Sequence, residues 1–374
     1  MPAAVDLSIT YTADIWSNLR GGIRRGERYL DNLDIILTVD AERALGWRGA
    51  TLFAYGLYNN GASFSGDLVG DLQTVSNIET GLRAARLYEA WIDQRFAGDR
   101  ASLRFGLYDL NSEFDTIETG SLSMLSSHGI GPDFAQSGRN GPSIFPVTSL
   151  ALRAEYRVSE NWVARAAVLD AVPGDPARPR RTTVRLGGDE GALLVGEVNY
   201  LDDDTKIGVG VWHYTSRFEP REAPAAGARP DAANRGVYML IERRLIRAGL
   251  DRPGSDATPG LAGWVRLGFA QDRVNPISRY LGGGLVYTGF LRAERDDRLG
   301  MAVAWVSFGR PYRRAVAVSG GRSERSEAVV ELTYRTPLTS WLMIQPNVQY
   351  VINPGGDPAL RNALVAGLRF EIGF

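Results

Sequence analysis

The chain contains 374 residues, of which 44% are hydrophobic, and its 42 basic and 43 acidic side chains leave a formal net charge of −1. No stretch approaches the roughly 18 apolar residues that a membrane-spanning helix requires. No basic block is interleaved with aromatic side chains, which argues against nucleic-acid binding, and the absence of cysteine excludes a disulfide framework and thiolate metal sites.

Segments of alternating apolar and polar residues recur along the whole chain, each near the length of a tilted membrane strand. Only helices and closed barrels satisfy the backbone polar groups in lipid. The pattern therefore predicts an all-β fold, a transmembrane antiparallel β-barrel of 16 strands, and an even number is typical of bacterial single-chain barrels. In chain order the strands are expected to begin near Leu7, Leu33, Ala50, Leu82, Ser102, Leu150, Val163, Ala192, Ile207, Val237, Leu261, Gly284, Leu299, Ala328, Leu342 and Ala363.

The expected connections alternate in length. Long ones follow the odd-numbered strands, at residues 19–28, 59–81, 112–146, 171–191, 215–236, 271–283, 309–325 and 353–361. Most others are short, although Arg247 to Gly260 is too long for the rule. Outer-membrane barrels have short periplasmic turns and longer extracellular loops, so we expect a bacterial outer-membrane protein with both termini periplasmic. Trp47, Trp162 and Trp341 fall in or just after expected periplasmic turns, as interfacial aromatics do, although strand-end packing also explains them.

The two ends of the chain support this interpretation. Met1-Pro-Ala-Ala lacks the basic and apolar regions of a signal peptide, so we expect a mature form from which a signal was removed. The last strand alternates strictly and ends on an aromatic residue, with Leu368, Phe370, Ile372 and Phe374 on one apolar face. That face is expected to contact outer-membrane lipid, and Phe374 is expected to be read by the barrel assembly machinery.

Strand parity also predicts the inward face, because successive side chains alternate across a strand. If Tyr88, Ala90 and Ile92 face lipid, the residues between them face the lumen. The candidate pore-lining and substrate-binding residues are Glu89, Trp91, Asp93, Arg104, Tyr108, Arg153, Glu155, Trp212, Trp264, Arg369 and Glu371. Carboxylates and arginines offer acceptors and donors to sugar hydroxyls, and aromatic rings offer faces for stacking. Opposed charges on a barrel wall also pair with one another and merely stiffen it, and this alternative stays open.

The longest connection, Ser112 to Pro146, is rich in glycine and serine. Loops of this length in a compact fold are usually functional or disordered. We expect residues 1–374 to form a single barrel domain in which this loop, about 112–146, folds inward and sets a constriction. A loop lying over the mouth is the alternative.

Several stretches resemble the carbohydrate-selective porin family of the OprB type, and the resemblance covers essentially the full chain. They are Asn32–Asp40, Ala44–Ala50, Leu87–Trp91, Leu103–Asp115, Ser143–Pro146, and Ile344–Tyr350 running into Asn353-Pro-Gly-Gly356. The resemblance implies a 16-stranded outer-membrane porin for passive diffusion of carbohydrates, glucose-type monosaccharides among them. It also implies a constriction lined by arginine, glutamate and aromatic side chains. The Pro- and Arg-rich stretch from Pro173 to Arg185 matches no motif of the family.

Other functions find less support in the sequence. A general or anion-preferring porin is the main alternative, although an anion pore would show basic residues without so many carboxylates. Nearly all basic residues are arginine, since Lys206 is the only lysine; genome composition explains this as well as a pore wall does. A structural or adhesin barrel is a remote alternative. His128 beside Ser126 and Ser127 is not in itself a catalytic arrangement, so no enzyme, cofactor or metal site is expected. Monomer and homotrimer stay open.

Overall fold

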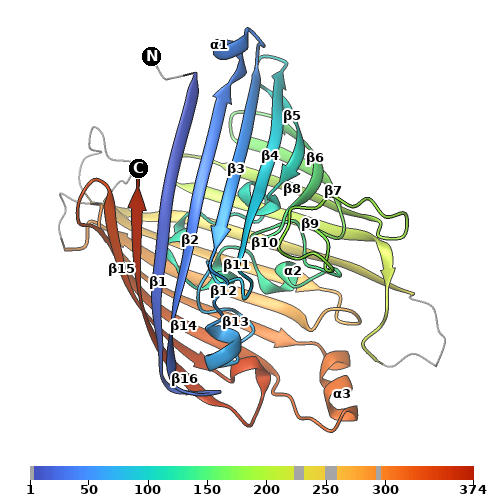
Figure 1. The fold of residues 1–374 in the computed structure, drawn as a ribbon, viewed down its shortest axis with the longest axis vertical. Helices are drawn as coiled ribbons and strands as arrows, with labels where there is room; N and C mark the ends of the chain where they lie inside the picture. Colours follow the sequence, from blue (N-terminus) through green and yellow to red (C-terminus); the bar gives the residue numbers. More distant parts are fainter. Residues whose placement is uncertain (1–3, 223–230, 249–258, 292–295) are drawn as a thin grey trace.

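The computed structural model describes residues 4–222, 231–248, 259–291 and 296–374. Within these residues sixteen antiparallel strands follow one another around a closed barrel (Figure 1), which confirms the expected fold class. The strands are β1 (Val5–Gly22), β2 (Gly26–Asp40), β3 (Ala50–Asn59), β4 (Ala84–Phe96), β5 (Ala101–Tyr108), β6 (Ser149–Arg157), β7 (Trp162–Asp170), β8 (Ala192–Leu201), β9 (Thr205–Phe218), β10 (Ala232–Arg247), β11 (Gly260–Ala270), β12 (Ile277–Thr288), β13 (Arg298–Phe308), β14 (Ser326–Pro337), β15 (Leu342–Ile352) and β16 (Arg361–Gly373).

The first and last strands close the sheet. β16 pairs with β1 in antiparallel register, with Asp14 opposite Arg369 and Tyr11 opposite Ile372, and β1 pairs with β2 on its other side. Closure leaves no sheet edge with unpaired backbone groups, which is the condition for a sheet in lipid. In the part of the chain that the structure describes, no helix is long and apolar enough to span a membrane.

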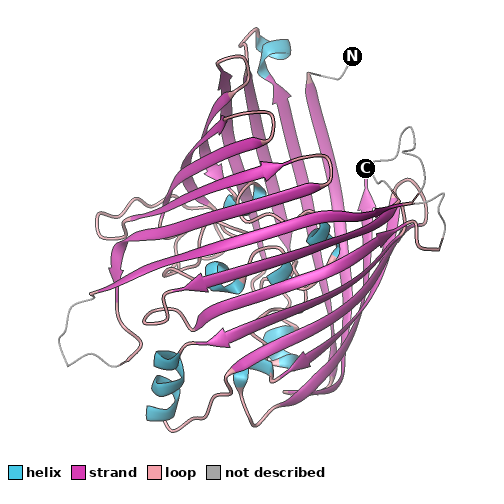
Figure 2. Ribbon diagram, turned by 180° about the vertical axis from the view of Figure 1, so that it is seen from behind, coloured by secondary structure: helices cyan, strands magenta, loops and turns pink. Residues whose placement is uncertain are grey.

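Short helical segments occupy the connections (Figure 2). They are α1 (Ala41–Leu45), η1 (Ser65–Val69), η2 (Leu110–Ser112), η3 (Thr119–Leu122), η4 (Ser126–His128), α2 (Pro132–Ala135), α3 (Arg310–Val318) and η5 (Pro354–Gly356). The helix α1 follows an even-numbered strand and α3 an odd-numbered one, and they lie at opposite ends of the barrel, with both chain termini toward the end that carries α1 (Figure 1). Nearly all of the expected long connection between Arg247 and Gly260 lies outside the described residues.

Two expected strand boundaries are wrong. The first connection is a tight turn at residues 23–25 rather than a long loop from Leu19 to Arg28, because Gly21 and Gly22 adopt the left-handed φ values of 73° and 62°. The strand β12 begins at Ile277 rather than near Gly284, so the run Gly282–Gly284 lies inside the strand and not at the end of the expected 271–283 connection. There the missing side chains leave room for the Tyr280 ring and for the Trp264 indole.

One expected face is also wrong. Tyr88 is buried rather than exposed to lipid, and its hydroxyl donates to Asp109 Oδ2 at 2.6 Å. The register between β3 and β4 shifts here, because Tyr55 pairs with Glu89 while Gly56 pairs with Leu87. Such a bulge inserts one residue and reverses the parity beyond it, so Leu87 takes the exposed position.

The buried apolar residues form two clusters in which connections pack against strands. The 60–83 connection, with Phe64 and Leu68, packs against β1, β2 and β12–β16. The 109–148 connection, with Phe114, Ile130 and Phe134, packs against β5–β11 and β13. These clusters bring loop residues to wall side chains that the sequence assigned to the lumen.

Candidate functional site

Strands β4, β5 and β6 carry a compact cluster of opposite charges. Asp93 lies opposite Arg104, and Arg104 lies opposite Arg153, so the three side chains share one face. Asp93 accepts from Arg104 Nε at 3.1 Å and from Arg153 Nη2 at 2.7 Å. Glu113, from the 109–148 connection, accepts from Arg153 Nε at 2.7 Å and lies 3.4 Å from Arg104 Nη1. The two carboxylates thus neutralise two arginines that would otherwise repel each other.

The two arginines differ in exposure and in remaining capacity. Arg153 is 2% exposed, and its guanidinium is bound by Asp93, Glu113 and the Ser102 hydroxyl. The Arg104 side chain is 15% exposed, and its guanidinium lies over the Trp91 ring at 3.7 Å. Burial alone would raise the pKa of the Glu113 carboxyl, but Arg104 and Arg153 outweigh it and hold that pKa below its usual range. The Glu113 carboxylate is therefore ionised near neutral pH, and Arg104 is the more accessible of the two arginines.

Two stacked aromatic rings support the Arg104 guanidinium. We call the Trp91 ring and the guanidinium that lies over it the Trp91–Arg104 shelf. The Trp91 ring stacks on Phe53 of β3 with centroids 4.5 Å apart and an interplanar angle of 10°. Trp91 Nε1 donates to Glu89 Oε2 at 3.1 Å, and the same carboxylate accepts from the backbone N–H of Asp109 at 2.9 Å. Tyr108 is buried and donates to Glu113. Glu89 and Tyr108 thus fix the start of the 109–148 connection, while Trp91 orients Arg104.

A hollow of about 340 Å³ opens beside this cluster. Five arginines and four carboxylates line it: Arg95, Arg100, Arg104, Arg153, Arg157, Asp93, Asp99, Glu113 and Glu155. The nearly equal numbers provide both donors and acceptors without a large net charge.

The remaining candidates lie in other groups. Glu155 pairs with Arg165 at 2.6 Å on the neighbouring strand. Arg369 is bound by Asp14 at 2.7 Å and by Asn77 of the 60–83 connection at 2.7 Å. Glu371 pairs with Arg335 at 2.9 Å. Of these, Glu155 alone lines the 340 Å³ hollow.

Two candidate tryptophans are covered by the 109–148 connection. Trp212 is 2% exposed and stacks on Phe134 with centroids 5.0 Å apart. Trp264 packs edge-on against His128 at 5.0 Å. In this conformation neither ring is open to a solute, so both support the connection.

Sequence parity placed Glu197 and Glu331 on the inward face and missed Glu242, and it did not show that these three carboxylates bind the backbone of this connection. Glu197 accepts from the N–H of Asp115 at 2.8 Å, Glu242 accepts from that of Thr119 at 2.6 Å, and Glu331 accepts from that of Met124 at 2.6 Å. Glu197 and Glu331 had inward parity, but their partners are backbone groups, which leave no mark in a sequence. These bonds to a charged acceptor are stronger than neutral ones.

Buried arginine–aspartate pairs fix the middle of the connection. Arg266 of β11 binds Asp115 through Nε at 2.9 Å and Nη2 at 2.6 Å, and its Nη1 binds Asp133. Burial raises the pKa of the Asp115 carboxyl to about 6, although Arg266 opposes the rise. Burial likewise raises the pKa of the Asp109 carboxyl to about 6, against hydrogen bonds from Tyr88 and Asn111. In this connection the pKa values of Asp109 and Asp115 are therefore raised, whereas the pKa of Glu113 is lowered.

Catalytic and metal chemistry find little support in the described residues. Burial lowers the pKa of His128 to about 3, so its ring is neutral, and the Ser127 hydroxyl donates to Gln73 rather than to this ring. Within the described ranges, no group of three or more histidine, cysteine, aspartate or glutamate side chains is placed to hold a metal ion.

Comparison with known proteins gives a consistent result. Residues 24–374 match the model of the family described as carbohydrate-selective porin, OprB family. The chain is 23% identical to Porin B of Pseudomonas aeruginosa, with 99% of the chain and 87% of that protein covered. It is 21% identical to a putative porin, QuiX, of Acinetobacter baylyi, with 97% and 89% covered. The high-pH structure of Pseudomonas putida OprB superposes with a TM-score of 0.85 at 20% identity, over 99% of this chain and 94% of that one.

Proposed function

The chain belongs to the OprB family of carbohydrate-selective porins, and we propose that sugars pass through it at a constriction between the Trp91–Arg104 shelf and an inward-folded 109–148 connection. As a porin of this family it is a channel of the bacterial outer membrane, not an enzyme.

The observation that carries the proposal is the anchoring of the 109–148 connection on distant strands. The connection leaves β5, yet Glu331 of β14 binds its backbone, and β14 lies almost opposite β5 in the closed order. Between these two strands, Glu197 of β8 and Glu242 of β10 also bind the backbone of the connection. A segment held by inward carboxylates on nearly opposite walls crosses the lumen and narrows a barrel whose strand number otherwise leaves an aqueous channel. Its helical turns are seen between the walls from both sides (Figures 1 and 2).

The chemistry of the 340 Å³ hollow supports a neutral, hydroxylated solute of glucose type. Arg104 donates, Asp93 and Glu113 accept, and each polar atom suits a sugar hydroxyl. Phe53 covers one face of the Trp91 ring and Arg104 covers the other, so Trp91 holds the Arg104 guanidinium in place for the solute instead of stacking on the sugar itself. An anion-preferring pore, the alternative function, would require a larger excess of cations than five arginines against four carboxylates.

We also propose an orientation in the membrane and partners for this barrel. Longer connections gather at the end that carries α3, which we assign to the extracellular side, so both termini are periplasmic. The exposed Phe374 follows β16 directly, and we assign it as the signal for barrel assembly. Deleting Phe374 is expected to lower the surface level in cells more than refolding in detergent. Both a monomer and a homotrimer are compatible with this arrangement.

Solute flux tests the function directly. In liposome swelling, the porin is expected to admit monosaccharides faster than disaccharides or amino acids of similar size. Planar-bilayer recordings under a salt gradient are expected to give a reversal potential near zero and a current that glucose reduces. A strongly anion-selective current without glucose block would favour the alternative, and absence of any flux would favour a structural barrel.

A further inference from the structure

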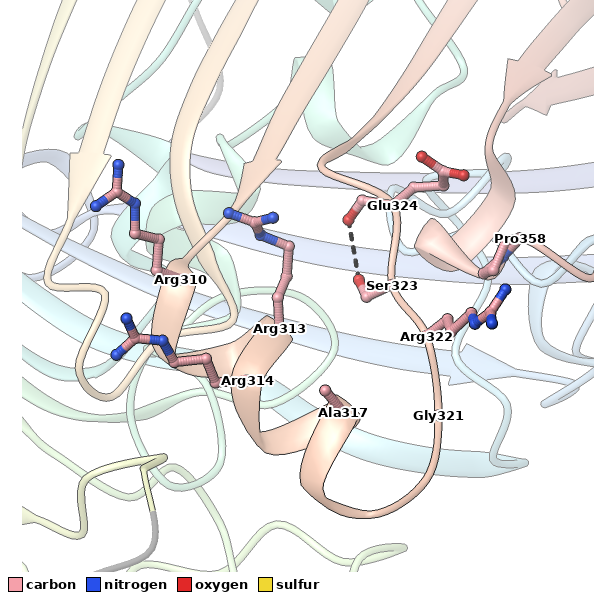
Figure 3. A pocket seen from close by; sticks show the side chains of 9 residues that line it. All are labelled: Arg310, Arg313, Arg314, Ala317, Gly321, Arg322, Ser323, Glu324 and Pro358. Atoms are coloured by element: carbon pink, nitrogen blue, oxygen red, sulfur yellow. Dashed lines mark hydrogen bonds between the residues drawn. The ribbon is translucent and has the colours of Figure 1, made fainter.

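The helix α3 presents a row of arginines to a second hollow, at the end of the barrel opposite α1 (Figure 1). Arg310, Arg313, Arg314 and Ala317 are spaced at i, i+3, i+4 and i+7, so they share one helix face. They line a hollow of about 610 Å³ together with residues 321–324 and Pro358 of the β15–β16 connection. Figure 3 shows the side chains of Arg310 and Arg313 rising from the same side of α3, while Arg322 extends from the following segment toward Pro358.

The lining of this hollow is strongly basic. Four arginines line it against a single carboxylate, Glu324. Arg314 forms an ion pair with Glu222 at 2.8 Å. Among the residues described in the structure, Arg310, Arg313 and Arg322 have no ion pair with a carboxylate, and Arg313 Nε is buried without a hydrogen-bond partner. The 340 Å³ hollow, by contrast, has a carboxylate beside each of its buried arginines.

This arrangement is unfavourable for the helix by itself. Like charges at i, i+3 and i, i+4 destabilise a helix, and cations in the first turn oppose the helix dipole. The first turn of α3 contains no acidic residue, and its N-cap, Gly309, provides no side-chain hydrogen bond. Local arrangements that work against stability without compensation are expected at functional sites. An anion bound in the hollow would offset the repulsion between these arginines and their unfavourable interaction with the helix dipole.

We propose that this hollow binds a phosphate group. The guanidinium fork matches two oxygens of a phosphate, and arginines from α3 and from the segment after it line this one hollow. The volume leaves room for a phosphate that is part of a larger molecule. Two sources share this chemistry, a phosphorylated glycolipid of the surrounding outer leaflet and a phosphorylated solute in the medium. This site is separate from the sugar path and does not depend on it.

Calorimetry with inorganic phosphate tests the site itself. The full-length refolded porin in neutral detergent is expected to bind phosphate, and added salt is expected to weaken the binding. The double variant Arg310→Gln/Arg313→Gln is expected to bind about tenfold more weakly or worse, and Arg322→Gln serves as an independent second variant. Arg181→Gln removes one exposed charge from the 171–191 connection and is expected to leave binding unchanged. Heat-modifiable electrophoretic mobility confirms that each variant is folded.

Reconstitution distinguishes the two sources. The porin is placed in phosphatidylcholine vesicles with or without lipid A, and its thermal unfolding is followed. A Tm raised by lipid A in the wild type but not in the double variant supports the lipid source. Phosphate binding in detergent without any effect of lipid A supports a soluble source. If neither probe distinguishes the wild type from the double variant, or if Arg181→Gln lowers binding equally, the proposed site is overturned.

Discussion

The wall formed by β4–β6 and the wall formed by β8–β14 contain the same kinds of inward residues but bind different partners. On the β4–β6 wall, Asp93 binds arginine side chains, and part of Arg104 stays open beside a hollow. On the β8–β14 wall, Glu197 and Glu331 bind backbone N–H groups of the 109–148 connection. The β4–β6 wall thus keeps part of a cation open beside a hollow, while the β8–β14 wall holds the 109–148 connection. Inward parity alone does not tell a solute-facing charge from an anchoring one.

Removing the anchored element gives the sharpest test of this comparison. Deletion of Ser121–Gly138 takes away Met124 and Phe134, which pack on the β8–β14 wall. We expect a several-fold rise in single-channel conductance and a weaker glucose block, both measured in planar bilayers. Deletion of Ala177–Arg185, whose backbone contacts Arg86 and whose Thr182 contacts Leu87, is the control and is expected to change neither. Wild-type conductance in the Ser121–Gly138 deletion would place the connection outside the path.

On the β4–β6 wall the buried arginine is expected to matter most for stability. Arg153→Ala leaves Asp93 and Glu113 without their main buried partner, at an expected cost of about 3 to 5 kcal/mol. The free energy of unfolding in urea measures the loss. Arg157→Ala, an exposed neighbour that lines the same hollow, is the control and is expected to cost less than about 1 kcal/mol. Equal losses in the two variants would mean that the Arg153 pairs contribute nothing beyond surface charge.

On the β8–β14 wall the expected effect is smaller and local. Glu331→Gln keeps the size of the side chain but removes the charge that binds the N–H groups of Met124 and Leu125. We expect a loss of about 1 to 2 kcal/mol, seen mainly as faster protease cleavage within residues 119–128 and as noisier channel current. Glu371→Gln, which affects a partly exposed pair with Arg335, is expected to leave cleavage unchanged. Unaltered cleavage in Glu331→Gln would show that apolar packing alone holds the connection.

The sequence predicted the strands well, because side-chain alternation determines them. It predicted bulges and loop contacts poorly, because single residues or backbone groups determine those. Alternation of period two predicted all the strands, because a strand with one lipid face cannot slip by one residue. It failed at Tyr88, since a bulge changes parity without changing composition. It failed at Gly282–Gly284, where glycine accommodates neighbouring rings within a strand. It located Arg104 and Asp93 on one face but could not identify Glu113 as their partner, since a loop residue has no parity.

Substitution of Arg104 is expected to change solute permeation more than it changes the stability of the barrel. Arg104→Ala removes the exposed cation on the Trp91 ring while Arg153 still neutralises Asp93. We expect a shift toward cation selectivity and weaker glucose block, with a stability loss of about 1 kcal/mol. Reversal potentials and glucose titration measure the shift, and Arg165→Ala, whose side chain pairs with Glu155 on the neighbouring strand, serves as a charge-matched control. Unchanged selectivity and block would assign Arg104 to the wall rather than to the path.

The smallest expected effect is a pH dependence that differs between acids of the same connection. Burial raises the pKa of Asp109 to about 6, whereas the unfolded value is about 3.9. The folded state therefore binds the proton more tightly, so its stability is greatest below about pH 4 and falls as pH rises toward 6.

Glu113 has a lowered pKa, so its contribution to stability is present above about pH 4.3 and is lost only at lower pH. Between pH 7 and 5 the raised pKa values of Asp109 and Asp115 should dominate, and each should add about 1 kcal/mol to the free energy of unfolding on acidification. Asp109→Asn is expected to reduce this rise, leaving the contribution of Asp115, and Glu113→Gln is expected to preserve it. A free energy that falls between pH 7 and 5 in the wild type would contradict the burial of these two aspartates.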